Sequence, residues 1–352
     1  MSEDPQELTP RPEQPPDGAW SWPGAPSATA APSRSPAANP PPPPPGYAPP
    51  TYGQPGAYPP VAGQPPVYPP PPEYYQQGGP GATTPYTQYP PTYPPMYPPG
   101  YGQDANRRYP VLYYLHGLGD NEQMFVRSGG FNLIEALWDG HQIGDFIVVT
   151  PAGYASFFMN SQDGHFRYDD FFLQEFMPWI ESHYRIAARR ESRGIGGISM
   201  GGYGALRLAF LHPQLFGSVN AQSGALMERL PAISVSNSPE SGRLRLLGNV
   251  FGSPPDPAFW DRNNPLAIAR TADLMGMKIY FDCGSQDDYG FEAGAQALDK
   301  VLLSRHIPHE FHLSSGGHNW GYFAEHLPDS LRFDSEAFRL SVRPTQTEQI
   351  PR

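Results

Sequence analysis

The stretch that decides the fold is RGIGGISMGGYGALRLAF, residues 193–210. Glycine is unfavourable inside helices and strands, so its accumulation around one serine indicates unusual backbone geometry. Gly197-Ile198-Ser199-Met200-Gly201 fits the pattern G-x-S-x-G and lies between a predicted strand and a predicted helix. In that context the serine occupies a sharp turn, and its hydroxyl projects above the sheet. Gly197 and Gly201 are then the small residues that let strand and helix approach each other closely.

Short apolar runs alternate with longer helix-like segments around this stretch. The runs that predict strands are 109–115, 145–150, 193–198, 217–222, 278–283 and 309–313. The segments that predict helices are 131–140, 168–184, 200–213 and 289–306. This alternation is typical of an α/β fold with a mainly parallel sheet flanked by helices. In such folds the functional groups lie on loops at the carboxyl ends of the strands.

Composition divides the chain into a tail and a domain. Of the 48 prolines, 34 lie in residues 1–100, among many Tyr and Gly and few Ile, Leu or Val. Proline removes backbone donors, and so few apolar side chains cannot offset the entropy of ordering. We therefore expect residues 1–97 to be a disordered tail with polyproline II character. The predicted domain spans 98–345 with a cap-like insertion at about 224–275, and 346–352 form a C-terminal tail.

Charge and cysteine content exclude several classes of function. The net charge is −11, and no Lys- or Arg-rich patch occurs, which argues against nucleic acid or an anionic membrane as partner. The single cysteine, Cys283, excludes an internal disulfide and a cysteine-based zinc site. We expect no metal and no cofactor. No signal peptide and no membrane-spanning run is visible. We expect a cytoplasmic protein, or a secreted one if the translation start is assigned wrongly.

A serine nucleophile needs a base, and the base needs an orienting acid. In this fold the order along the chain is serine, acid, histidine, each after a strand. GSQDDYGF, after the run 278–283, offers Asp287 and Asp288, while Asp282 lies on the strand and has a structural interpretation. SSGGHNWGYF, after the run 309–313, offers His318. The spacing does not separate Asp287 from Asp288.

Two backbone amides are candidates for an oxyanion hole. The amide of Met200 lies at the N-terminus of the predicted helix and points the same way as Ser199. His116-Gly117-Leu118-Gly119 ends the first clear strand, and a loop there can supply a second amide, from Leu118. The alternative is a simple tight turn. Another alternative, a dinucleotide-binding turn around Gly194-x-Gly196, places serine where the third glycine belongs.

These segments together resemble a known family. RYPVLYYLHGLGDNEQMF, GGISMGGYGALRLAFLHPQLFGSVNAQSGAL, YFDCGSQDDY and SSGGHNWGYF are similar to the esterase D-like family of α/β-hydrolases, from about Pro98 to Phe338. That family includes S-formylglutathione hydrolases, feruloyl and short-chain acyl esterases, and mycolyltransferases. The resemblance implies Ser199 as nucleophile and His318 as base. It favours Asp287 as the acid, because the family pattern C-G-x-x-D matches residues 283–287.

The resemblance also sets expectations about function. It implies a serine esterase that acts on small acyl esters, either short-chain or aryl, with the short-chain branch most similar. An acyltransferase or a thioesterase on the same three residues is the alternative, and a non-catalytic scaffold is a second one. The family usually has an edge hairpin before its P-P-G-Y segment. Here Pro98-Pro99-Gly100-Tyr101 follows the tail directly, so we expect those first strands to be missing. The tail itself is either a plain linker or a ligand for a partner that recognises polyproline.

Overall fold

One parallel sheet organises the part of the chain that the computed structural model describes, residues 95–99, 101–230 and 246–341. Within these residues six strands pair in the order β2-β1-β3-β4-β5-β6. Their bounds are β1 Val111–Leu115, β2 Ile147–Val149, β3 Arg193–Gly197, β4 Ser218–Gln222, β5 Lys278–Gly284 and β6 Glu310–Ser314. All neighbouring pairs are parallel, so the predicted sheet is confirmed. Each predicted run overlaps one strand, and their ends differ by at most two residues.

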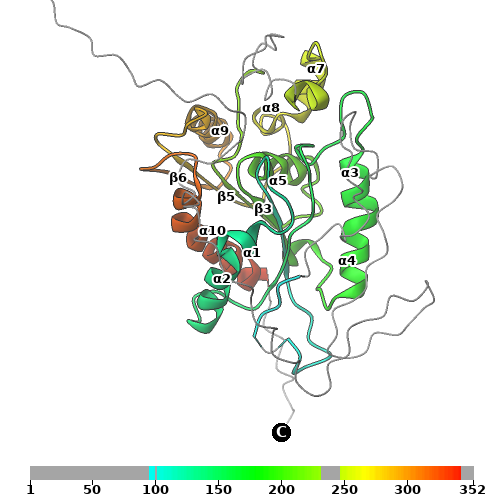
Figure 1. The fold of residues 1–352 in the computed structure, drawn as a ribbon, viewed down its shortest axis with the longest axis vertical. Helices are drawn as coiled ribbons and strands as arrows, with labels where there is room; N and C mark the ends of the chain where they lie inside the picture. Colours follow the sequence, from blue (N-terminus) through cyan, green and yellow to red (C-terminus); the bar gives the residue numbers. More distant parts are fainter. Residues whose placement is uncertain (1–94, 100, 231–245, 342–352) are drawn as a thin grey trace, which may run out of the picture.

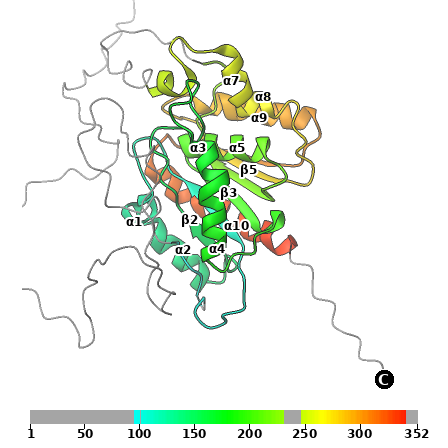
Figure 2. The ribbon, with the colours of Figure 1, turned by 90° about the vertical axis from the view of Figure 1, so that its right-hand side faces the viewer.

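Helices cover both faces of the sheet (Figures 1 and 2). One face carries α3 Tyr168–Asp170, the π-helical η2 Phe171–Phe176, α4 Met177–His183, α5 Met200–Leu211 and α9 Phe291–Ser304. The other carries α1 Met124–Ser128, α2 Gly130–Asp139 and α10 Trp320–Ser341. A single-turn η3 spans Arg190–Ser192, just before β3. The predicted helix 168–184 is thus continuous but contains a π-helical segment, and α10 is a helix that the sequence pattern did not predict.

Strands β1 and β2 are apolar on both sides because both of their sides are covered. On β1, Val111, Tyr113 and Leu115 pack into one core cluster, whereas Leu112 and Tyr114 pack into the other. A strand buried on both faces requires an apolar residue at every position instead of alternation. This explains why the strand VLYYL has no polar residue.

The glycines within β3 make room for polar side chains of its neighbour. A Cβ on Gly194 would lie 2.7 Å from the Oγ of Ser218, and one on Gly196 would overlap the amide of Asn220. Both β4 side chains donate hydrogen bonds to the carboxylate of Asp334 on α10, Ser218 at 2.8 Å. Gly194 and Gly196 therefore lie inside a strand and not in a phosphate-binding turn, so the dinucleotide alternative does not hold.

Asp334 gives the protein a specific pH dependence. Burial raises its pKa to about 7, although the hydrogen bonds from Ser218 and Asn220 oppose the shift. An unfolded aspartate has a pKa of about 3.9, so between about pH 4 and pH 7 the folded state binds more protons than the unfolded state. The Asp334 contribution therefore lowers the free energy of unfolding as pH rises through this window.

We expect Asp334→Asn to remove this contribution. The free energy of unfolding of the variant, relative to that of wild type, should increase as pH rises from 5 to 7. Above the folded pKa of Asp334 the difference between the two proteins should become constant. Urea unfolding of both proteins at pH 5, 6, 7 and 8 measures the difference directly. A difference in unfolding free energy that does not change with pH would contradict the assignment.

The two ends of the predicted domain and its insertion are only partly described. Met96 is buried and forms an isolated antiparallel bridge with Val148 of β2, although it lies inside the predicted tail 1–97. Among the described residues before β1 there is no strand, only this bridge and one at Tyr109. Residues 1–94, most of the predicted tail, and 346–352 lie outside the described residues.

The described part of the insertion packs against α5. It includes a helical segment at 246–251, α7 Pro257–Asn263 and α8 Pro265–Ile268, while 231–245 lie outside the described residues. The hydroxyl of Tyr203 donates to the carbonyl of Asn263 at 2.7 Å. Arg207 binds the Asn263 side chain and both carboxylate oxygens of Asp169. This buried network joins the insertion to α5 and α3.

Candidate active site

Ser199 lies on a sharp turn between β3 and α5. Its backbone angles are φ 54° and ψ −118°, a conformation that a non-glycine residue rarely adopts. The chain is so compact here that a Cβ on Gly197 would lie 2.6 Å from the carbonyl oxygen of Leu115, and one on Gly201 would overlap the same oxygen. The pattern G-x-S-x-G is therefore explained by close backbone approach on either side of the serine.

We expect Gly201→Ala to destabilise the fold by about 3 kcal/mol, because the added methyl would displace backbone of β1 and not a flexible side chain. Gly102→Ala is the matched control, since a Cβ there meets nothing within 4 Å. Urea unfolding of the two variants gives the comparison. Equal stability of the two variants would show that the turn tolerates a wider separation than the structure indicates.

The structure brings Ser199, His318 and Asp287 into one line. The Nε2 atom of His318 lies 2.9 Å from the Oγ of Ser199, and its Nδ1 lies 2.7 Å from the Oδ2 of Asp287. A carboxylate only accepts hydrogen bonds, so Nδ1 carries the proton and Nε2 accepts from the serine hydroxyl. All three residues are buried, with 7%, 2% and 8% of their surface exposed for Ser199, His318 and Asp287.

The two adjacent aspartates have different partners. Asp287 contacts the imidazole ring, whereas the Oδ2 of Asp288 accepts a hydrogen bond from the backbone N–H of His318 at 3.0 Å. The Oδ1 of Asp287 also accepts from the amide of Tyr289 at 3.0 Å. Burial alone would raise the pKa of Asp287, but its interaction with His318 and the hydrogen bonds from the backbone N–H groups of Tyr289 and Phe291 together outweigh burial and hold that pKa below its usual value.

Both amides predicted for the oxyanion hole are available as donors. Among the described residues, neither the N–H of Met200 nor that of Leu118 has a hydrogen-bond acceptor within the protein. Gly117 brings the Leu118 loop close to the nucleophile, because a Cβ on Gly117 would lie 3.6 Å from the Cβ of Ser199. Unpaired donors beside a nucleophile are suited to bind a developing oxyanion.

His116 holds this loop, a role that the sequence did not reveal. Its Nδ1–H donates to the carbonyl of Gly117 at 2.8 Å, and its Nε2 accepts from the N–H of Gly153 at 2.8 Å. Burial lowers the pKa of His116, which keeps the ring neutral and preserves both hydrogen bonds. The alternative of a simple tight turn does not account for these two hydrogen bonds of the His116 ring.

Asp282 and Tyr322 support the loop that carries His318, residues 315–319, which we call the histidine loop. The hydroxyl of Tyr322 donates to the Oδ1 of Asp282 at 2.9 Å, and its ring lies so close to Gly316 that a Cβ there would be 2.7 Å away. Burial raises the pKa of Asp282 to about 7. The structural interpretation of Asp282 agrees with these contacts. The sequence analysis did not predict a role for Tyr322, because only the folded structure brings α10 to the end of β5.

Cys283 is buried, and its thiol contacts the Oδ2 of Asp287 at 3.7 Å. Burial raises the pKa of the thiol well above its usual value, so it stays protonated and can donate to the carboxylate. This agrees with its interpretation as a buried residue and not a nucleophile.

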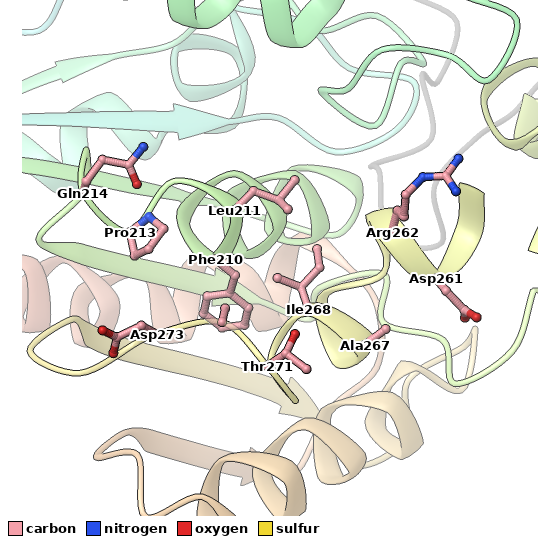
Figure 3. A pocket seen from close by; sticks show the side chains of 11 residues that line it. Phe210, Leu211, Pro213, Gln214, Asp261, Arg262, Ala267, Ile268, Thr271 and Asp273 are labelled. Atoms are coloured by element: carbon pink, nitrogen blue, oxygen red, sulfur yellow. The ribbon is translucent and has the colours of Figure 1, made fainter. Parts of the chain in front are cut away.

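Aromatic rings surround the imidazole of His318. Tyr289, Phe291 and Phe323 lie with ring centroids at 4.7, 5.4 and 5.2 Å, all nearly perpendicular to it. Tyr289 and Phe291 are partly exposed, so part of this apolar surface beside His318 is open to solvent. A separate hollow of about 510 Å³ lies at the C-terminal end of α5, between Phe210 and Asp273 (Figure 3). None of the three aligned side chains lines that hollow.

The parallel sheet, the turn at Ser199 and the aligned side chains define the α/β-hydrolase class. A model of the family described as "Putative esterase" matches residues 89–333, and the chain belongs to that family. Within the described residues no helix has the length and apolarity needed to cross a bilayer. In the same part of the chain no group of three or more His, Cys, Asp or Glu side chains is arranged to hold a metal ion.

Individual relatives agree with the family assignment. Esterase Rv1288 of Mycobacterium tuberculosis (strain ATCC 25618 / H37Rv) is 31% identical over 261 residues, covering 68% of this chain and 54% of the relative. The chain thus spans about half the length of that curated relative. Acetyl esterase of Caldicellulosiruptor saccharolyticus is 25% identical over 229 residues, covering 64% and 83%. The solved structure of a ferulic acid esterase has a TM-score of 0.58 and 25% identity, covering 68% and 89%.

Proposed function

We propose that this chain hydrolyses small carboxylic esters through an acyl-enzyme intermediate on Ser199. The observation that carries the proposal is the continuous contact from Ser199 Oγ to His318 to Asp287, at 2.9 and 2.7 Å. Serine is a weak nucleophile, and it becomes effective when an adjacent imidazole takes its proton. A buried, ionised carboxylate holds that imidazole in the tautomer that can accept it.

The proposed reaction follows from these contacts. Ser199 Oγ attacks the ester carbonyl while His318 Nε2 takes the proton, and the carbonyl oxygen becomes an oxyanion on the amides of Leu118 and Met200. The imidazolium then protonates the leaving alcohol, which departs as the acyl-enzyme forms. Water, deprotonated by His318, attacks the acyl-enzyme and releases the acid. Asp287 orients the imidazole and stabilises its positive charge throughout.

Two features support short-chain or aryl esters as substrates. The partly exposed rings of Tyr289 and Phe291 offer an apolar surface beside the reacting atoms, against which an aromatic or short aliphatic group can pack. In addition, the relatives named above include an acetyl esterase and a ferulic acid esterase.

The test is a set of p-nitrophenyl esters from acetate to octanoate, with methyl ferulate as an aryl substrate. We expect kcat/KM to be highest for acetate or the ferulate and to fall as the aliphatic chain lengthens. A steady rise with chain length would contradict the proposed substrate class. Turnover only with thioesters, or only when an alcohol acceptor is added, would replace it with a thioesterase or an acyltransferase.

A further inference from the structure

A continuous row of aromatic rings lies at the end of the sheet opposite to Ser199, where α4 ends beside the segment that leads into β1 (Figure 1). We call Trp179, Tyr184, Tyr97, Tyr101 and Tyr109 the aromatic row. Successive ring centroids in this order are 6.2, 6.0, 4.3 and 5.4 Å apart. The row joins two distant parts of the sequence, residues 97–109 and 179–184.

Arginine side chains contact one end of the row, and a histidine ring contacts the other. The guanidinium of Arg185 lies 3.9 Å from the ring centroid of Tyr101, and that of Arg107 lies 4.6 Å from the centroid of Tyr109. At the other end the exposed ring of His183 stacks on Trp179 at 4.0 Å. Cations over aromatic faces contribute favourable energy and help to fix the row. Its open part consists of Trp179, Tyr97 and Tyr101, which are partly exposed, whereas Tyr184 and Tyr109 are buried beneath.

Two members of the row belong to a sequence repeat. YPPTYPPMYPPGY, residues 89–101, places a tyrosine at every fourth position and two prolines after each of the first three. In the structure the last two of these tyrosines, Tyr97 and Tyr101, stack on each other, and Pro98 is buried. Met96 exchanges two backbone hydrogen bonds with Val148, at 2.9 and 3.1 Å. The final repeat is thus already bound to the domain.

We propose that the aromatic row is a docking surface for the preceding Tyr-Pro-Pro repeats of this same chain, with Tyr93 packed beside Trp179 and His183. The described chain begins at residue 95 on this surface, so the preceding repeat starts within reach. Four residues of polyproline II helix span about 12 Å, and the ring-to-ring steps from Tyr97 through Tyr184 to Trp179 are 6.0 and 6.2 Å.

Physical chemistry favours this occupant over a free partner. Flat aromatic surfaces bind proline-rich segments because the polyproline II helix is preformed and loses little entropy. The covalent connection at residue 95 also gives the repeat a high effective concentration at the row. The proline-rich segment then has a binding site in its own domain, at the end of the sheet remote from the active site, and ester hydrolysis is independent of it.

Hydroxyl-radical footprinting of the full chain, with oxidation sites located by mass spectrometry, tests the proposal. In the wild-type protein we expect Tyr93 to be oxidised several-fold more slowly than Tyr58, which lies in a distant repeat. Tyr89→Ser with Tyr93→Ser should increase the oxidation of Trp179 several-fold. The same change at Tyr58 and Tyr68 is the matched control and should leave Trp179 unaffected. These tail variants alter no residue of the described domain, so misfolding does not confuse the result.

The reciprocal variant Trp179→Ala should raise the oxidation of Tyr93 to that of Tyr58 while ester hydrolysis persists. Equal oxidation of Tyr93 and Tyr58 in the wild-type protein would overturn the proposal. So would a Trp179 oxidation rate that is unchanged by the substitutions at Tyr89 and Tyr93. Protection that grows with protein concentration would assign the row to the tail of a second copy and would equally overturn docking within one chain.

Discussion

Replacement of Ser199 by alanine is expected to reduce kcat for ester hydrolysis about 10⁶-fold, to the level that binding and the oxyanion amides alone supply. The change removes only the Oγ atom, 2.9 Å from His318 Nε2, and leaves the backbone of the turn in place. The neighbouring thiol of Cys283 cannot take its role, because it is buried and protonated.

The measurement is the initial rate with p-nitrophenyl acetate, alongside circular dichroism and urea unfolding of both proteins. Ser315→Ala is the matched control, because this exposed serine lies on the histidine loop and its hydroxyl makes a long hydrogen bond to Gln286, at 3.5 Å. It should retain wild-type turnover. Persistent activity in a folded Ser199→Ala protein would move the chemistry to another residue.

The second large effect is expected at Asp287. Asp287→Asn should lower kcat about 10⁴-fold, because an amide N–H facing Nδ1 of His318 would favour the tautomer that cannot accept the serine proton. Asp288→Asn should keep kcat near the wild-type value. In the wild-type protein Asp288 accepts from the backbone N–H of His318 at 3.0 Å, and an asparagine amide oxygen can accept the same hydrogen bond. The adjacent positions make these variants a closely matched pair.

Steady-state kinetics of Asp287→Asn and Asp288→Asn with the same ester show which aspartate orients the imidazole. A loss confined to Asp287→Asn agrees with the ring contact at 2.7 Å. If Asp288→Asn were the crippled variant, Asp288 and not Asp287 would orient the imidazole in solution. Large, equal losses would mean that fixing the loop backbone matters as much as fixing the ring.

The positions of β1 and β2 were predictable because strands covered on both faces have short, continuously apolar runs. The chain order of serine, acid and histidine likewise placed the three candidate residues at the ends of β3, β5 and β6. Local pattern could not separate Asp287 from Asp288, since adjacent residues share the same loop and only their three-dimensional direction differs. The family pattern favoured Asp287, and the structure places that side chain on the ring.

The features that the sequence did not reveal depend on contacts between distant residues. α10 presents Asp334 to β4 and Tyr322 to Asp282, so polar residues on its buried side mask the usual apolar periodicity. His116 acquires its role from the amide of Gly153, which lies on a separate loop. The glycines of β3 likewise have their reason in the side chains of the neighbouring strand.

The most direct test of the central claim is covalent labelling of the intact protein with a fluorophosphonate ester, followed by peptide mass mapping. The serine oxygen displaces fluoride from phosphorus and keeps the phosphonyl group, so the label reports which hydroxyl is activated. We predict one adduct, on the peptide that contains Ser199, that is absent in Ser199→Ala and forms much more slowly in Asp287→Asn. An adduct at a different residue, or no adduct in protein that hydrolyses p-nitrophenyl acetate, would contradict the assignment of Ser199 as nucleophile.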